Sequence, residues 1–269
     1  MEGAAQLVNK TMPKPNVLVL RSPGTNCDEE TAFGFEKAGA SADRVHVKAI
    51  LDSPKQMENY QILCFPGGFS YGDDLGAGSI LAHQIRRPLR DALLAFRDSG
   101  KLILGICNGF QILIRTGLLV ADTNEGLPAA TLTNNASAKY EDRWVKLKKT
   151  SDKCVFLRGI ESMELPVGHG EGRFVAKDAK TLSQLETNGQ IVLRYRGESG
   201  NSAGYPANPN GSQSDAAGVC DESGRVFGLM PHPDRHLLAT NHPQWTRRAK
   251  QPEHGDGFAV FQNAVQFFA

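Results

Sequence analysis

Cys107 stands between two glycines, in Gly105-Ile106-Cys107-Asn108-Gly109. Apolar residues precede it and an amphipathic pattern follows, which predicts a G-x-nucleophile-x-G turn from a strand into a helix. The flanking glycines remove side chains that would collide in such a turn, so the thiol is expected to be presented rather than buried. A helix N-terminus favours the thiolate, and the N–H of Asn108 can face a developing oxyanion. The motif therefore indicates a nucleophile, with a small core cysteine as the alternative.

A cysteine that cleaves an amide needs a group that accepts its proton and later protonates the leaving nitrogen. His232 lies between Pro231 and Pro233 at the end of an apolar stretch, and Asp234 follows two residues on. Residues i and i+2 of an extended chain share a face, so Asp234 could hold the His232 ring. The alternative is an ordinary histidine in a Pro-rich surface turn.

Cys27 is the rival nucleophile because it also precedes a predicted helix. Three acidic residues, Asp28 to Glu30, follow it directly and should disfavour its thiolate. The five cysteines are an odd number and widely scattered, which argues against a disulfide framework, and no pair has the spacing of a zinc site. The remaining three are expected to be packing residues: Cys64, Cys154 and Cys220.

Short apolar runs alternate with helical patterns through the first half of the chain. The expected strands are Val17 to Leu20, Val45 to Ile50, Ile62 to Phe65 and Lys101 to Ile106. The expected helices begin at Asp28, after Ser53, after Pro88 and after Cys107, and glycines at 39, 100 and 117 end the first, third and fourth. This alternation predicts an α/β fold with a mostly parallel central sheet, helices on both faces and a site at the carboxyl ends of the strands.

The pattern weakens beyond about residue 130, where three strand-like pieces remain: Arg143 to Leu147, Arg173 to Ala176, and Ile191 to Tyr195. We expect them to add antiparallel strands to the same sheet. Residues 1–15 lack the features of a secretory signal and are expected to form a disordered tail. Residues 16–269 then form a single domain.

The bulk composition excludes several classes of protein. The formal charge is +1, from 30 basic and 29 acidic residues, so no global field attracts nucleic acid or an acidic membrane. A mean hydropathy of −0.33 and the absence of a long apolar run exclude a predominantly membrane chain, and the cytoplasm is the expected location. No Walker-type loop is present, so ATP is not expected to bind here. The acidic loop Tyr71 to Asp74 would repel phosphate, so we interpret it as an active-site rim or partner contact.

Four segments together carry a resemblance to a known family: Pro66-Gly67-Gly68-Phe69-Ser70-Tyr71-Gly72-Asp73, Gly105 to Gln111, His169-Gly170-Glu171-Gly172-Arg173, and Gly228-Leu229-Met230-Pro231-His232-Pro233. In this order they resemble the triad-type (class I) glutamine amidotransferases, whose sheet is flavodoxin-like. The likeness runs from about Val17 to the C-terminus.

The resemblance implies Cys107 as nucleophile, His232 as base, and the backbone of Gly68 and Asn108 as the oxyanion hole. The family's triad ends in glutamate where this chain has Asp234, which is one methylene shorter. The chain must therefore sit closer to the ring, or the orienting bond must lengthen. The resemblance also implies that Gln111, and main chain near His169 to Gly172, contact glutamine, with His169 and Gly170 as the named residues of that segment. No metal is expected.

Within the family, the chain is most similar to the branch that serves purine biosynthesis. The resemblance implies that ammonia passes to a large synthetase subunit, which uses ATP and magnesium to convert formylglycinamide ribonucleotide into formylglycinamidine ribonucleotide. A small bridging subunit is a further expected partner, and no cofactor is expected in this chain. Two alternatives stay open: another cysteine hydrolase of the superfamily, or a non-catalytic regulatory module of the same fold.

Overall fold

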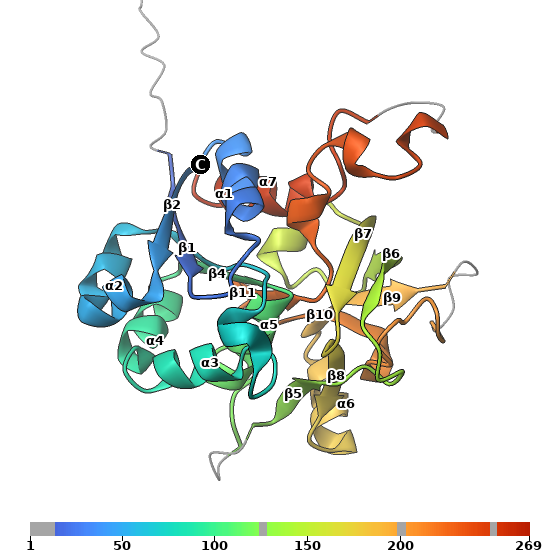
Figure 1. The fold of residues 1–269 in the computed structure, drawn as a ribbon, viewed down its shortest axis with the longest axis horizontal. Coiled ribbons are helices and arrows are strands. Elements are labelled where there is room, and N and C mark those ends of the chain that lie inside the picture. The colour runs from blue at the N-terminus through green and yellow to red at the C-terminus, as the bar shows by residue number, and fades with distance from the viewer. Residues whose placement is uncertain (1–13, 124–127, 198–202, 248–251) are drawn as a thin grey trace, which may run out of the picture.

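A nine-stranded sheet runs through the computed structural model, which describes residues 14–123, 128–197, 203–247 and 252–269 (Figure 1). The spatial order of its strands is β2-β1-β3-β4-β11-β10-β9-β6-β7. The strands are β1 Asn16–Arg21, β2 Ser41–His46, β3 Ile62–Phe65, β4 Leu102–Ile106, β6 Glu141–Lys149, β7 Ser162–His169, β9 Ile191–Arg196, β10 Ala216–Cys220 and β11 Val226–Leu229.

Five neighbouring strands, from β2 to β11, are parallel to one another. Strands β3, β4 and β11 are buried along their whole length, as expected for parallel strands covered on both faces. The loops that follow β1, β3, β4 and β11 carry Cys27, Gly68, Cys107 and His232 respectively. Because parallel strands end at the same edge, the fold brings these four loops together.

Helices lie on both sides of the parallel strands (Figure 1). Helix α1 packs against β1, β2 and α7, whereas α5 packs against β3, β4, β11 and α3. The α-helices are α1 Asp28–Lys37, α2 Val47–Asp52, α3 Ser79–Arg86, α4 Arg90–Asp98, α5 Asn108–Thr116, α6 Ala179–Thr187 and α7 Phe258–Gln266. The 3₁₀ segments are η1 Pro54–Asn59, η2 Ser70–Asp73, η3 Val155–Leu157, η4 Gln213–Asp215, η5 Pro233–Arg235, η6 Ala239–Asn241 and η7 Trp245–Arg247.

Antiparallel strands extend the sheet on the side away from β2. Strand β10 pairs antiparallel with β11 and β9, and β6 pairs antiparallel with β9 and β7. The expected α/β fold with added antiparallel strands is thus confirmed. One piece differs, because Arg173–Ala176 is strand β8 of a separate two-stranded sheet with β5 Ala130–Thr133.

The predicted strand from Val45 to Ile50 is wrong in its second half, where Val47 begins helix α2. Val47 and Ile50 are three residues apart and both are buried, which is helical spacing, and His46 caps the helix by accepting from the N–H of Lys48. Helix α3 was not predicted. Of the expected disordered tail, only Lys14 and Pro15 belong to the described residues.

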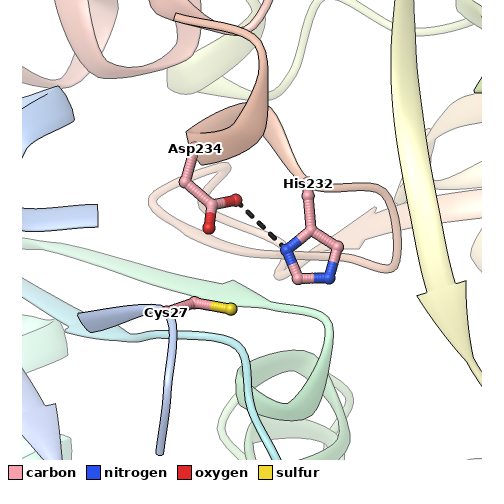
Figure 2. Close-up of side chains that lie close together, drawn as sticks. All are labelled: Cys27, His232 and Asp234. Atoms are coloured by element: carbon pink, nitrogen blue, oxygen red, sulfur yellow. Dashed lines mark ion pairs between the residues drawn. The ribbon is translucent and has the colours of Figure 1, made fainter. Parts of the chain in front are cut away.

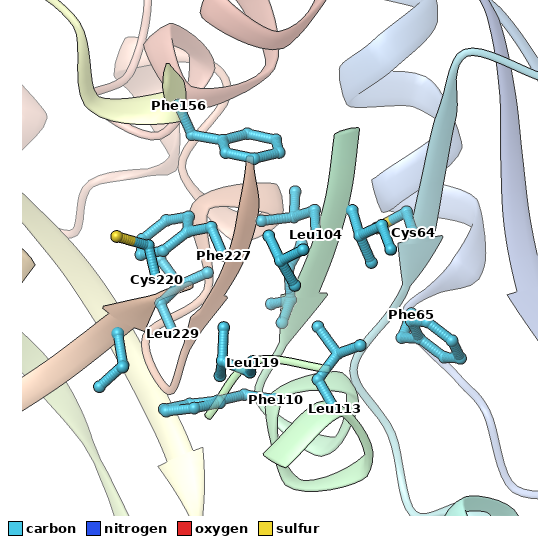
Figure 3. Packing of buried hydrophobic residues seen from close by; sticks show 14 of the residues in the cluster. Cys64, Phe65, Leu104, Phe110, Leu113, Leu119, Phe156, Cys220, Phe227 and Leu229 are labelled. Carbon is cyan, nitrogen blue, oxygen red and sulfur yellow. The ribbon is translucent and has the colours of Figure 1, made fainter. Parts of the chain in front are cut away.

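The core under the site is aromatic and aliphatic (Figure 3). Leu104 of β4 and Phe110 of α5 pack together with Phe227 of β11, and the Phe156 and Phe227 ring centroids are 5.7 Å apart. Cys64, Cys154 and Cys220 belong to this core, which confirms them as packing residues, and all five cysteines are free. Among the described residues, no helix is both long and apolar enough to cross a membrane.

Candidate active site

Cys107 occupies a strained turn between β4 and α5, with φ 50° and ψ −104°. Its N–H donates to the carbonyl of Leu229 at 2.8 Å, which ties the turn to β11. A Cβ at Gly109 would lie 1.8 Å from the carbonyl oxygen of Phe65, and one at Gly105 would lie 2.6 Å from that of Gly109. The turn therefore needs both glycines, for the steric reason expected from the sequence.

The Cys107 thiol lines a cavity of about 150 Å³. The residue is only 5% exposed, and its sulfur lies 3.6 Å from the carbonyl oxygen of Gly168. The expectation of a presented, unburied thiol is thus wrong in part, because β7 covers the turn and leaves only this cavity. Its walls are Gly68, Phe69, Asp73, Ala77, Cys107, Gln111, Tyr140, Gly168, His169, Gly170 and Glu171. A buried thiol beside a small cavity can attack a ligand that fills the cavity and displaces water from it.

His232 and Asp234 form a buried ion pair, with Nδ1 and Oδ1 3.3 Å apart (Figure 2). The segment is not the extended chain expected from the sequence, since Asp234 lies in the 3₁₀ turn η5. No donor is aligned for a hydrogen bond with either Asp234 oxygen among the described residues. The separation exceeds the usual length of a charge-assisted bond, about 2.7–2.9 Å. It fits the expectation that the shorter aspartate lengthens the orienting contact.

The charges around His232 determine how readily its ring is protonated. Burial lowers the pKa of His232, but the negative charges of Asp234 and Cys107 outweigh this effect, so its pKa is raised well above the usual value. A histidine that is protonated readily beside a thiol can take the proton of that thiol. The arrangement can therefore supply a thiolate with a proton donor next to it.

Cys27, the rival nucleophile, lies beside the same histidine (Figure 2). It is 1% exposed, and its sulfur accepts a hydrogen bond from Nη2 of Arg235 at 3.2 Å. Burial raises the pKa of the Cys27 thiol, and the charge of Asp234 adds to this rise. The pKa of the Cys27 thiol is thus raised, as expected, but the main cause is burial. The negative charge of Asp28 has little effect on this thiol because Asp28 is paired with Arg21 and Arg44.

Cys27, His232 and Asp234 offer one sulfur, one nitrogen and one oxygen within 4.8 Å of one another. This is the one cluster of three or more candidate metal ligands among the residues that the structure describes. The donor set would suit zinc. However, the guanidinium of Arg235 donates to the Cys27 sulfur, so a positive charge already occupies this side of the cluster and disfavours a cation.

Gly68 and Asn108, the expected oxyanion donors, flank the turn of Cys107. Gly68 has φ 143°, and a Cβ there would lie 2.8 Å from the backbone nitrogen of Asn26. Asn108 opens helix α5, whose first N–H groups have no acceptor within the helix. Its side chain accepts from the N–H of Ser70 at 3.2 Å and so ties the Gly68 loop to the helix.

Gln111 and His169 both line the cavity, as does Gly170. Nε2 of Gln111 donates to the carbonyl of Glu171 at 2.7 Å, and its Oε1 accepts from Nδ2 of Asn108 at 2.9 Å. Burial and the positive charge of His232 lower the pKa of His169 to about 4, so this ring is neutral at physiological pH. His169 thus shapes the cavity without carrying charge.

Three cavity residues with polar side chains were not predicted as ligand contacts: Asp73, Tyr140 and Glu171. Asp73 was placed only in the rim loop, and Glu171 lies within a motif for which only main-chain contacts were expected. Tyr140 directly precedes β6 and lacks any local signal, because β7 pairing brings it over Gly168. A pocket that binds glutamine needs polar side chains in its walls, and this requirement could have pointed to Asp73 and Glu171.

Comparison with known proteins independently supports the family that the sequence motifs resemble. Residues 14–268 match the family described as the CobB/CobQ-like glutamine amidotransferase domain. The chain is 45% identical over 266 residues to the phosphoribosylformylglycinamidine synthase subunit PurQ of Methanococcus maripaludis, covering 94% of this chain and 97% of the relative. It is 44% identical over 258 residues to the protein of the same name in Dehalococcoides mccartyi, covering 95% and 98%.

A solved structure, described as the structure of PurLQS from Thermotoga maritima, contains a chain with the same fold. The TM-score is 0.72 at 33% identity, over 96% of this chain and 100% of that chain. The family match spans almost every residue from the first strand to the last helix. This chain belongs to the CobB/CobQ-like glutamine amidotransferase family, alongside the PurQ subunits of phosphoribosylformylglycinamidine synthase.

Proposed function

We propose that the chain is the glutaminase subunit of a phosphoribosylformylglycinamidine synthase. It hydrolyses glutamine through a cysteinyl thioester and passes ammonia to an ATP-dependent synthetase subunit, which makes formylglycinamidine ribonucleotide in de novo purine biosynthesis. One observation carries the chemistry: a cysteine on a strained strand-to-helix turn lines a small cavity and interacts with a buried His–Asp pair. The relatives support the choice of pathway.

In the first step the sulfur of Cys107 attacks the carbonyl carbon of the glutamine side-chain amide. Nδ1 of His232 faces Asp234, so Nε2 is the atom left to exchange protons with the thiol and the substrate. Asp234 holds the ring and stabilises the imidazolium that forms. The backbone N–H groups of Gly68 and Asn108 stabilise the tetrahedral oxyanion.

In the second step the adduct collapses as His232 gives its proton to the leaving nitrogen, and ammonia departs. A glutamyl thioester on Cys107 remains. His232 then accepts a proton from water as that water attacks the thioester carbonyl. His232 returns that proton to the sulfur as glutamate leaves, which restores the thiol. Three residues contact glutamine in this scheme: Gln111, His169 and Gly170.

The partners in this proposal are a large synthetase subunit, which binds ATP and magnesium, and a small bridging subunit. The similar chain in the PurLQS structure supports an assembly of this kind. This chain itself works without a cofactor. A cytoplasmic location follows from the proposed place in purine synthesis.

The test is a glutaminase assay with the synthetase subunit supplied. We expect glutamate and ammonia from glutamine, and a loss of at least about 10³-fold with Cys107→Ala, since the nucleophile is removed. If the protein with its partner hydrolysed peptides but left glutamine intact, it would be a different cysteine hydrolase. If Cys107→Ala left synthase activity unchanged, the chain would be a regulatory module.

A further inference from the structure

Arg235 connects the turn that carries the proposed base to the start of helix α1. Its Nη2 donates to the Cys27 sulfur at 3.2 Å, and its Nε lies 3.9 Å from Oε1 of Glu30. Its own N–H donates to the carbonyl of His232 at 3.3 Å within the 3₁₀ turn η5. The side chain of Arg235 is 43% exposed, whereas Cys27 is buried. The guanidinium therefore reaches inward from the surface and ties the His232 turn to a buried sulfur.

The Cys27 sulfur is also held from its other sides. It donates to Oδ1 of Asn26 at 3.3 Å, and the main-chain N–H of Cys27 donates to the carbonyl of Gly67 at 3.3 Å. Burial raises the pKa of the thiol, so the S–H keeps its proton for Asn26 while the sulfur accepts from Arg235. A Cβ at Gly67 would lie 2.7 Å from Cε1 of His232, and the sulfur lies within 4.8 Å of a nitrogen of the same ring (Figure 2). Gly67 and the sulfur thus lie against the His232 ring.

The ring of His232 needs more than Asp234 to keep its orientation. The 3.3 Å between Nδ1 and Oδ1 is long for a charge-assisted hydrogen bond, and among the described residues no donor is aligned with either Asp234 oxygen. The N–H of His232 donates to the carbonyl of Pro166 at 2.8 Å, which fixes the main chain but not the torsion of the ring. Cys27 and Gly67 therefore supply a packing constraint that the carboxylate alone does not.

Arg235 also places a positive charge near the buried carboxylate of Asp234, whose side chain is 0% exposed. Burial lowers the pKa of Arg235, but the Cys27 sulfur and the charges of Asp234 and Glu30 outweigh this effect, so its pKa is raised. A buried carboxylate without an aligned donor depends on nearby positive charge to remain ionised. The guanidinium thus contributes both a hydrogen bond to the sulfur and a charge that stabilises ionised Asp234.

We infer that Arg235 and Cys27 are a positioning pair for His232: the guanidinium holds the sulfur against the ring, and the sulfur keeps the ring turned toward Cys107. Neither residue is among the described residues that line the Cys107 cavity, so both act through the ring and not on the ligand. This inference rests on the proposed function and assigns a role to a buried cysteine that the reaction does not consume.

The experiment measures glutaminase kinetics in the complex with the synthetase. Active sites are counted by labelling with the glutamine analogue 6-diazo-5-oxo-L-norleucine, so that kcat refers to folded sites alone. Cys27→Ala and Arg235→Met should each lower kcat about 10-fold and change KM less than about twofold, because a misoriented base slows proton transfer but leaves the cavity intact. The double variant should also lose about 10-fold rather than about 100-fold, since the two side chains make one contact.

Conservative variants separate positioning from a loss of packing. Cys27→Ser keeps an acceptor for the guanidinium and should retain more kcat than Cys27→Ala. Arg235→Lys keeps the charge and a donor, and its kcat should stay within about threefold of the unaltered complex. Arg44→Met is the matched control, since Arg44 pairs with Asp28 and Glu29 at the start of the same helix and should leave kcat unchanged.

The pH profile of kcat/KM is the readout that a merely structural role would not move. The titratable groups around His232 are Asp234, Cys27, Cys107, His169 and Tyr140. Removing the positive charge of Arg235 favours the imidazolium, so the limb that reports His232 should move to higher pH in Arg235→Met and stay in place in Arg235→Lys.

An unchanged kcat in both single variants would overturn the inference. Multiplying losses in the double variant, with the His232 limb unmoved in Arg235→Met, would also overturn it, because the two residues would then support the fold separately. Fewer labelled sites with a normal kcat per site would have the same meaning. Failure of the unaltered complex to hydrolyse glutamine would instead reject the proposed function.

Discussion

The sulfur of Cys27 and the ring of His232 lie together in the buried site, with ligand atoms within 4.8 Å of each other (Figure 2). Only a glycine fits at position 67 beside them, since a Cβ there would lie 2.7 Å from Cε1 of His232 and 3.1 Å from the Cys27 sulfur. His232 also interacts with Cys107. Two thiols therefore share one candidate base, and the chemistry must distinguish them.

Labelling by 6-diazo-5-oxo-L-norleucine should make this distinction. We expect one adduct per chain at Cys107, retained in Cys27→Ala and lost in Cys107→Ala, because burial raises the pKa of the Cys27 thiol and keeps it protonated. Intact-protein and peptide mass spectrometry would locate the adduct. An adduct on Cys27 in the unaltered chain would reverse the assignment of the nucleophile.

Asp234→Asn should lower kcat about 100-fold with little change in KM, since the ring loses the charge that orients it. The charge of Asp234 helps to raise the pKa of His232, so removing it lowers that pKa. The limb of the pH profile of kcat/KM that reports His232 should therefore move to lower pH.

Asp234→Glu is the matched variant, because it keeps the charge and restores the side chain usual in the family. It should retain more activity than Asp234→Asn. If both variants matched the unaltered protein in kcat and in pH profile, Asp234 would have no part in orienting the ring.

Elements that follow from local pattern were predicted well, whereas those that depend on distant contacts were not. Helix α5 was predicted because its glycines and apolar spacing are local. Helix α3 follows Gly78, which has φ 72°, and lacks a capping side chain, so no start signal marks it. Strand β7 pairs with β6 and brings the carbonyl of Gly168 to the Cys107 sulfur, and no residue near position 107 signals this pairing.

The same reasoning applies to the site. Cys107 was singled out by its local motif, because a tight strand-to-helix turn has a local signature. His232 was singled out by the family resemblance, because an isolated Pro-flanked histidine is equally compatible with a surface turn. The position of Cys27 beside His232 results from the order of the parallel strands, which no local pattern encodes. The contact between His232 and Asp234 was expected for an extended segment but forms in a 3₁₀ turn, since side-chain proximity has more than one backbone solution.

Gly109→Ala should destabilise the protein by more than about 3 kcal/mol, because the new Cβ would lie 1.8 Å from the carbonyl oxygen of Phe65 and α5 must move off β3. Urea unfolding followed by circular dichroism would measure it. Gly204→Ala is the control, since nothing lies within 4 Å of a Cβ there and its effect should stay within about 0.5 kcal/mol. Equal stability of the two variants would contradict the close packing of α5 on β3.

His169 should make the fold sensitive to acid. Burial lowers its pKa in the folded protein to about 4, against 6.5 for an unperturbed histidine. As the pH falls from about 6.5 to about 4, the unfolded chain takes up a proton that the folded chain does not, so the free energy of unfolding falls. A difference of about 2.5 pKa units corresponds to about 3 kcal/mol. Above pH 6.5 and below pH 4 this contribution no longer changes with pH.

His169→Asn removes the titrating group, so its free energy of unfolding should fall by about 3 kcal/mol less than that of the unaltered chain between pH 6.5 and pH 4. Urea denaturation across this range measures both slopes, and any constant offset from lost packing cancels in the comparison. The exposed His83 provides the control, since His83→Asn should leave the slope as it is. Parallel curves for His169→Asn and the unaltered chain would mean that the folded protein protonates this ring as readily as the unfolded chain does, which would contradict the lowered pKa.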